Sequence, residues 1–191
     1  MSAVAGTATR VMDVAEALIQ HRGYGGFSFD DLAQAVGIRK PSVHHHFRTK
    51  ADLVAALARR YTERFESALA AIDVARRDPV ARLKAYVRLF ATTYAQDGRL
   101  CVCGMLGAEA DALPTDVADA VAGFFRFNLN WLAATFRDAQ QSGRVTSGQR
   151  PAALAELMLS ALEGAMVVGR GSRAGGGPEA VGKSLLAGLA R

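Results

Sequence analysis

The sequence predicts an all-α protein. Along most of its 191 residues, apolar side chains recur every three or four positions, which is the spacing of one face of an α-helix. No alternating pattern of convincing length indicates a strand, and glycines or prolines separate the periodic segments. We therefore expect about nine helices. Half of the residues are apolar, so the chain can bury a sizeable core without disulfides.

Three helices are expected at the N-terminal end. The first covers residues 9–22, where the apolar positions share one face. Ser28 is a suitable N-cap for a second helix, which ends at Gly37. Pro41 suits the first turn of a third helix that ends near Phe47, because the missing N–H of proline would be unpaired there in any case.

Longer helices are expected over the rest of the chain. Their predicted ranges are residues 50–75, 80–95, 106–112, 116–141, 151–168 and 179–189. The segment 169–178 contains five glycines and a proline, so it is expected to be a flexible loop. The chain is expected to divide into a head of residues 1–50 and a larger helical body of residues 51–191.

Positive charge is concentrated near the start of the chain. The net charge is +5, and residues 1–60 account for +3 of it. The twelve residues from Arg39 to Lys50 carry four Lys or Arg side chains and no acid. This basic patch coincides with the expected third helix and its flanks, and it indicates an anionic partner such as nucleic acid.

Three consecutive histidines, His44, His45 and His46, stand within the basic patch. Adjacent residues on a helix point about 100° apart, so these side chains cannot converge on one metal ion. No nucleophile is placed beside them and no cofactor-binding glycine loop occurs, so no metal site, cofactor or enzymatic activity is predicted. The remaining interpretations are a solvated basic face and a surface that faces DNA. The helix-turn-helix pattern of the first three helices favours DNA.

The residues of the head resemble those of a known family. The resemblance is carried by Gly23, Ser28, Leu32-Ala33, Gly37-Ile38, Pro41-Ser42-Val43-His44-His45-His46-Phe47, Lys50 and Leu53. This order is similar to the N-terminal signature of TetR/AcrR-family transcriptional regulators. The resemblance implies a helix-turn-helix DNA-binding domain followed by a helical effector-binding and dimerisation domain. It also implies a homodimer that binds an operator in double-stranded DNA.

The resemblance further implies which side chains contact DNA. Base contacts are expected from Arg39, Lys40, Pro41 and His45, and phosphate contacts from Ser28, Ser42, His44, His46 and Lys50. Arg10 is expected to reach the neighbouring minor groove. Arginine can bond bidentately to guanine, and proline can touch a thymine methyl group. The expected function is sequence-specific regulation, most simply by a repressor that a small-molecule effector releases from a palindromic operator.

Large apolar side chains and a few polar groups in the body are candidates for an effector pocket. They are Phe90, Tyr94, Met105, Glu109, Phe124, Phe127, Asn128, Trp131, Met158, Glu163 and Met166. The open alternative is that the apolar ones are ordinary core and the polar ones a solvated helix face. By resemblance, the last two helices form the dimer interface, unless they only complete the core of a single chain.

Cys101 and Cys103 form a C-x-C pair. Two thiols are too few for a structural zinc site, and burial is the common fate of a free cysteine. An alternative function is a redox or electrophile sensor that uses this pair, and another is an enzyme or carrier that uses the pocket of the body. The sequence lacks a secretory signal and an apolar run long enough to span a membrane, which predicts a cytoplasmic location.

Overall fold

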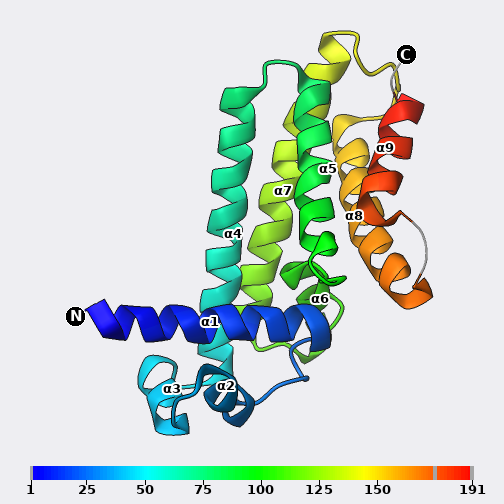
Figure 1. Ribbon diagram of the computed structural model, residues 1–191. Coiled ribbons are helices and arrows are strands. Elements are labelled where there is room, and N and C mark those ends of the chain that lie inside the picture. The colour runs from blue at the N-terminus through cyan, green and yellow to red at the C-terminus, as the bar shows by residue number, and fades with distance from the viewer. Residues whose placement is uncertain (1, 174–175, 190–191) are drawn as a thin grey trace. The chain divides into compact units, whose positions relative to one another are not determined.

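Helices account for most of the residues that the structure, a computed structural model, describes, namely residues 2–173 and 176–189 (Figure 1). They are α1 (Ser2–Arg22), α2 (Phe29–Val36), α3 (Lys40–His46), α4 (Lys50–Ala75), α5 (Pro79–Ala95), α6 (Val102–Gly107), the 3₁₀ helix η1 (Ala110–Ala112), α7 (Thr115–Gln141), α8 (Pro151–Ser172) and α9 (Gly177–Leu189). No strand occurs within those residues, and the prediction of an all-α fold is confirmed.

Local sequence signals define α2 and α3. The Ser28 hydroxyl accepts a hydrogen bond from the backbone N–H of Asp31, and the Asp31 carboxylate accepts one from the backbone N–H of Ser28. This reciprocal capping box fixes the start of α2. Gly37 ends α2 with a φ of 74°, a left-handed conformation that favours glycine. Pro41 lies in the first turn of α3, as predicted.

Two helix starts differ from the prediction by more than two residues. Helix α1 begins at Ser2 rather than at residue 9, because the alanine-rich residues before position 9 favour a helix although they carry no apolar stripe. Helix α6 and the short η1 replace the single helix expected over residues 106–112. The buried side chains Val102, Cys103 and Leu106 start α6 earlier than predicted.

The segment 169–178, predicted to be a loop, is partly helical. Helix α8 continues to Ser172, and α9 begins at Gly177. A Cβ atom at Gly169 would lie 2.7 Å from the hydroxyl oxygen of Tyr94. This glycine therefore permits the close approach of a tyrosine and does not break the helix. Residues 174 and 175 lie outside the described residues.

The chain folds into two compact units. Unit 1 comprises Met1–Glu63 and Val102–Phe124, and unit 2 comprises Arg64–Cys101 and Phe125–Arg191. In unit 1, α2, α3 and α6 pack against α1 (Figure 1). In unit 2, α9 packs against both α5 and α8. The functional division expected at residue 50 is a separate boundary, and it stays a prediction.

Candidate DNA-binding surface and effector site

Helix α3 presents a continuous exposed face. Val43 is fully buried and anchors the helix on the core of unit 1. The predicted contact residues that are exposed around it are Arg39, Lys40, Pro41, Ser42, His44 and His45. His46 is only partly exposed. This short helix therefore turns nearly all of its predicted DNA contacts toward solvent, as a helix that reads a DNA groove must.

Contacts within unit 1 orient part of this face. The ammonium of Lys40 lies 2.7 Å from the carboxylate of Asp30 in an exposed ion pair. Such pairs contribute about 0–1 kcal/mol, so a phosphate can compete for the lysine. The ring of His44 packs edge-on against Phe29, with centroids 4.9 Å apart. The guanidinium of Arg39 has no hydrogen bond or ion pair with the part of the chain that the structure describes.

The three histidines do not assemble into a metal site. The rings of His45 and His46 lie edge-on, with centroids 5.3 Å apart. The Nδ1 atom of His44 lies 3.3 Å from the carbonyl oxygen of Arg48. Across residues 2–173 and 176–189, no three His, Cys, Asp or Glu side chains are grouped as metal ligands.

Arg10, Ser28 and Lys50 have partners inside unit 1. Arg10 donates a hydrogen bond of 2.7 Å to the carbonyl oxygen of Val36. The Ser28 hydroxyl donates to the carboxylate of Asp31, 2.7 Å away, in addition to its role as the cap of α2. For these residues a DNA contact would compete with an existing bond, and such contacts stay predictions.

Lys50 makes a hydrogen bond and two cation–π contacts within unit 1. Its ammonium donates to the carbonyl oxygen of Phe27 and lies over the rings of Tyr24 and Phe27, at 4.7 and 4.1 Å from their centroids. Partial burial lowers the pKa of Lys50, while the charges of Glu109 and Asp31 act in the opposite direction. The lysine therefore ties the start of α4 to the turn that precedes α2.

Glu109, a predicted effector contact, lies against that same turn. Its carboxylate accepts hydrogen bonds from the backbone N–H groups of Tyr24, at 2.7 Å, and Gly25, at 3.3 Å. Gly23 begins the turn in a left-handed conformation, with a φ of 74°. A carboxylate that accepts two amide hydrogen bonds binds more strongly than a neutral acceptor does. The residue thus links the segment after α6 to the turn between α1 and α2.

A buried polar cluster lies within unit 2. The hydroxyl of Tyr86 donates a hydrogen bond of 2.9 Å to Oδ1 of Asn128, and both residues are fully buried. The ring of Trp131 stacks on Tyr86, with centroids 5.6 Å apart and an interplanar angle of 19°. The indole N–H of Trp131 donates to the carboxylate of Asp73, 2.9 Å away. A few fixed polar groups within an apolar interior are typical of small-molecule sites.

Glu163 adds an acid to this region. The residue is partly exposed, but its Oε1 atom is buried and has no hydrogen-bond partner in the described ranges. Burial raises the pKa of Glu163 to about 7. A hydrogen bond with the thiol of Cys101 lowers this pKa by a smaller amount. Burial also raises the pKa of Tyr86 well above its ordinary value, with further contributions from the nearby Glu163 and Cys101. An unpaired buried oxygen of this kind is a vacant hydrogen-bonding position.

The other predicted effector residues fall into both units. Unit 1 contains Met105, Glu109 and Phe124, and unit 2 contains Phe90, Tyr94, Phe127, Asn128, Trp131, Met158, Glu163 and Met166. The residues among these that are buried as core are Phe90, Phe124, Met158 and Met166. Phe124 packs on Tyr61, with ring centroids 5.5 Å apart. Tyr94 packs against Gly169 and Gly177. Its ring therefore lies between the end of α5, the last turns of α8 and the start of α9.

Sequence reasoning missed Tyr86 and the contribution of Cys101 to this cluster. Tyr86 lies on the buried face of α5, together with Leu83, Val87 and Phe90. A tyrosine hydroxyl on a buried helix face needs a buried hydrogen-bond partner. This requirement could have identified Tyr86 as a member of a polar cluster. Cys101 and Cys103 are both buried and form no disulfide. No pattern in the sequence indicated that the thiol of Cys101 bonds to Glu163.

Two family models match the sequence, one for each part of the chain. Residues 11–57 match the model of the bacterial regulatory proteins of the tetR family. Residues 79–179, more than half of the chain, match the tetracyclin repressor-like C-terminal domain. The chain belongs to the TetR family.

Relatives of this TetR-family chain agree in sequence and fold. The transcriptional regulator AcuR of Cereibacter sphaeroides is 34% identical over 155 residues, which cover 78% of this chain and 69% of AcuR. A TetR-family regulator from Agrobacterium tumefaciens has a TM-score of 0.91 at 31% identity, with 98% of this chain and 100% of that chain covered. The regulatory protein TetR from Rhodobacter sphaeroides has a TM-score of 0.85 at 28% identity, with 95% and 97% covered.

These relationships confirm the family, the helix-turn-helix head and the helical C-terminal domain predicted from the sequence. The TetR-family chain is a DNA-binding transcriptional regulator. Repression and ligand binding are typical of this family. The segment matched by the DNA-binding model contains the exposed α3. The segment matched by the C-terminal model contains Tyr86, Asn128 and Glu163.

Proposed function

We propose that this TetR-family regulator is a repressor that binds a palindromic operator as a homodimer and leaves it when a small molecule binds the body. The observation that carries the proposal is the exposed basic face of α3, anchored through the buried Val43. Residues 1–50 would serve as the DNA-binding head and residues 51–191 as the effector-binding and dimerisation body. No catalytic step and no cofactor belong to this function, and its place is the cytoplasm.

In this proposal the residues of α3 divide between bases and phosphates. Arg39, Lys40, Pro41 and His45 would meet base edges, and Ser42 and His44 would meet phosphates. The assignment of Arg39 to a base is the most specific, because its guanidinium is exposed, has no partner among the described residues and can bond bidentately to a guanine. Arg10, Ser28, His46 and Lys50 would add contacts at the edge of the same surface.

The apolar surface of α8 and α9 supports the homodimer. Leu157, Val168 and Val181 are 45, 67 and 38% exposed. Leu157 and Val168 are eleven positions apart on α8, which places them on one face. Within the described residues, α8 is the one helix that is long and apolar enough to cross a membrane, with 44% of its most apolar window buried in the chain. A second copy of the chain would cover the remainder of this surface.

The cluster of Tyr86, Asn128, Trp131 and Glu163 supports an effector site in the body. A ligand with a hydrogen-bond donor would satisfy the unpaired Oε1 atom of Glu163. AibR, whose fold is similar at 21% identity and a TM-score of 0.73, has been solved with isovaleryl coenzyme A and operator DNA. A ligand that prefers the conformation unable to bind DNA must antagonise the operator reciprocally.

A cysteine-based sensor is not favoured. Cys101 and Cys103 are 1% and 0% exposed, and reactive cysteines occupy partly exposed sites beside positive charge. An enzyme or carrier that uses the body's pocket is not favoured either, since the family is one of transcriptional regulators.

The test is selection of bound duplexes from a random library, followed by titration of the selected duplex at two salt concentrations. We expect a palindrome whose affinity falls steeply as salt rises, because each neutralised phosphate releases counterions. Arg39→Ala should lower discrimination at one base pair of each half-site by about 1–3 kcal/mol. Selection of no preferred duplex would contradict the proposal. An equal loss of affinity for all duplexes would reassign Arg39 to a phosphate.

A further inference from the structure

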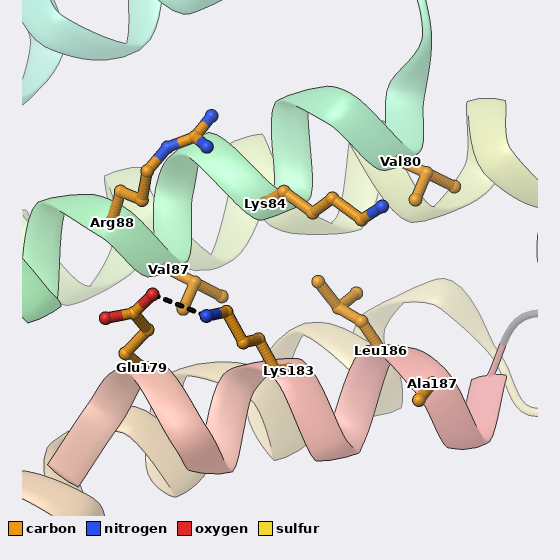
Figure 2. Close-up of a pocket in the computed structure, with 8 residues that line it drawn as sticks. All are labelled: Val80, Lys84, Val87, Arg88, Glu179, Lys183, Leu186 and Ala187. Atoms are coloured by element: carbon orange, nitrogen blue, oxygen red, sulfur yellow. Dashed lines mark ion pairs between the residues drawn. The ribbon is translucent and has the colours of Figure 1, made fainter. Parts of the chain in front are cut away.

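A groove in unit 2 lies apart from the proposed effector cluster. It runs between α5 and α9 and has a volume of about 490 Å³ (Figure 2). Its lining residues are Val80, Lys84, Val87, Arg88, Glu179, Lys183, Leu186 and Ala187. The volume falls within the range of about 300–1,000 Å³ that small-molecule sites occupy.

The floor of the groove is apolar and closely packed. Val80, Val87 and Leu186 are 7, 3 and 6% exposed. A Cβ atom at Gly182 would lie 2.5 Å from Cγ1 of Val87. Glycine at this position therefore lets α9 approach α5 closely enough to form the floor.

The rim of the groove carries an excess of positive charge. The Lys183 ammonium lies 2.6 Å from the carboxylate of Glu179, and this pair lies at one end of the groove (Figure 2). Lys84 extends from α5 toward the other end, beside Val80 (Figure 2). Lys84 has no hydrogen bond or ion pair with the described residues, and Arg88 contributes only longer-range attraction to Glu179. After Glu179 is paired with Lys183, two positive charges remain without a carboxylate of their own.

We propose that this groove binds an amphipathic anion, a molecule with an apolar chain that ends in a single carboxylate or phosphate. The chain would lie on Val80, Val87 and Leu186. The anionic head would bond to Lys84 at the end of the groove beside Val80, and Arg88, toward the other end, would add longer-range attraction (Figure 2). Three rim cations against one acid select against a cationic ligand, and the apolar floor selects against a fully hydrophilic one.

The groove faces away from Val181, one of the residues proposed for the dimer surface. Val181, on the apolar face assigned to the dimer, is two positions from both Glu179 and Lys183. A helix turns about 100° per residue, so the side chain of Val181 points to the opposite side of α9. The groove therefore lies on the other side of α9 from Val181, and it is lined by none of the side chains of the effector cluster. The inference does not depend on the proposed repressor function.

The test is isothermal titration calorimetry of the full chain with three probes of equal chain length, octanoate, octyl phosphate and octanol. We expect saturable binding of one anion per chain and binding of octanol at least about tenfold weaker, because the alcohol lacks the charge-assisted bonds. The anion that binds with the higher affinity shows whether the groove prefers a carboxylate or a phosphate. Lengthening its chain should raise affinity about fourfold per methylene until the groove is full. Binding of neither anion below about 1 mM, or equal binding of octanol, would overturn the proposal.

Variants localise the binding to the groove. Lys84→Gln combined with Arg88→Gln should weaken the preferred anion about tenfold or more and leave octanol unchanged. Arg126→Gln removes an exposed cation elsewhere in unit 2 and is the matched control, with no change expected. Ala187→Trp should fill the groove and block both anion and alcohol without altering the charge. Undiminished anion binding by the folded Lys84/Arg88 double variant would place the ligand elsewhere and refute the proposal.

Discussion

Glu163 should make the stability of this regulator depend on pH. Burial raises the pKa of this carboxyl from its ordinary value of 4.5 to about 7. Each pH unit between these values corresponds to about 1.4 kcal/mol, so the folded state favours the neutral carboxyl by about 3 kcal/mol. The unfolded chain binds fewer protons than the folded chain in this range, and stability therefore falls as pH rises from 4.5 through 7.

The variant Glu163→Gln tests this effect, because glutamine keeps the shape of the side chain and does not titrate. At pH 5 both the wild type and the variant carry a neutral group at this position. At pH 8 the wild-type carboxyl must ionise in its buried site. The variant should therefore gain about 2.5 kcal/mol in unfolding free energy relative to the wild type between these pH values.

Urea unfolding monitored by tryptophan fluorescence is the assay. The chain has one tryptophan, Trp131, and it lies in unit 2 together with Glu163. Protein concentration is held constant, since the proposed dimerisation would link stability to it. The control Glu156→Gln changes an exposed carboxylate on the same helix and should leave the pH dependence within about 0.5 kcal/mol of the wild type. If Glu163→Gln and the wild type differ by the same amount at pH 5 and pH 8, the reasoning about the buried carboxyl is refuted.

Three further outcomes are expected. Val168→Asp should convert the proposed dimer to a monomer in analytical ultracentrifugation. Val74→Asp, at a valine 89% exposed on α4, should leave the dimer intact. An unchanged dimer in the first variant would exclude this face. Glu109→Ala should lower the stability of unit 1 by about 2 kcal/mol in hydrogen-exchange measurements, because its bonds to two backbone amides are lost. Protection of unit 1 equal to that of the wild type would contradict a stabilising role for these two bonds. Ser28→Ala should cost about 1 kcal/mol in chemical denaturation by removing the cap of α2, and a neutral effect would mean that another group caps the helix.

Features that depend on neighbouring residues were predictable from the sequence. The capping box of Ser28 and Asp31, the left-handed Gly37 and the proline in the first turn of α3 join groups at most a few positions apart. The exposed basic face of α3 follows from the same local pattern, because helical geometry fixes which side chains surround the buried Val43. Local spacing therefore determined the candidate DNA-binding surface.

Contacts between segments far apart in the sequence were visible only in the tertiary structure. Glu109 was expected in an effector pocket, yet it bonds to the amide of Tyr24, 85 positions away. Tyr86 was missed, although it pairs with Asn128, 42 positions along the chain. Helical periodicity identifies a buried face, but it does not determine which other buried face that side chain meets.

By itself, the sequence determined the helical class, the family and the helix that is the candidate to face DNA, because these depend on spacings within a few turns. Only the tertiary structure decided two further features. One buried oxygen of Glu163 has no partner among the described residues, and α5 and α9 enclose a groove in which Lys84 has no ion pair with those residues. Burial and charge pairing are properties of the space around a side chain. That space is created when segments far apart in the chain pack together.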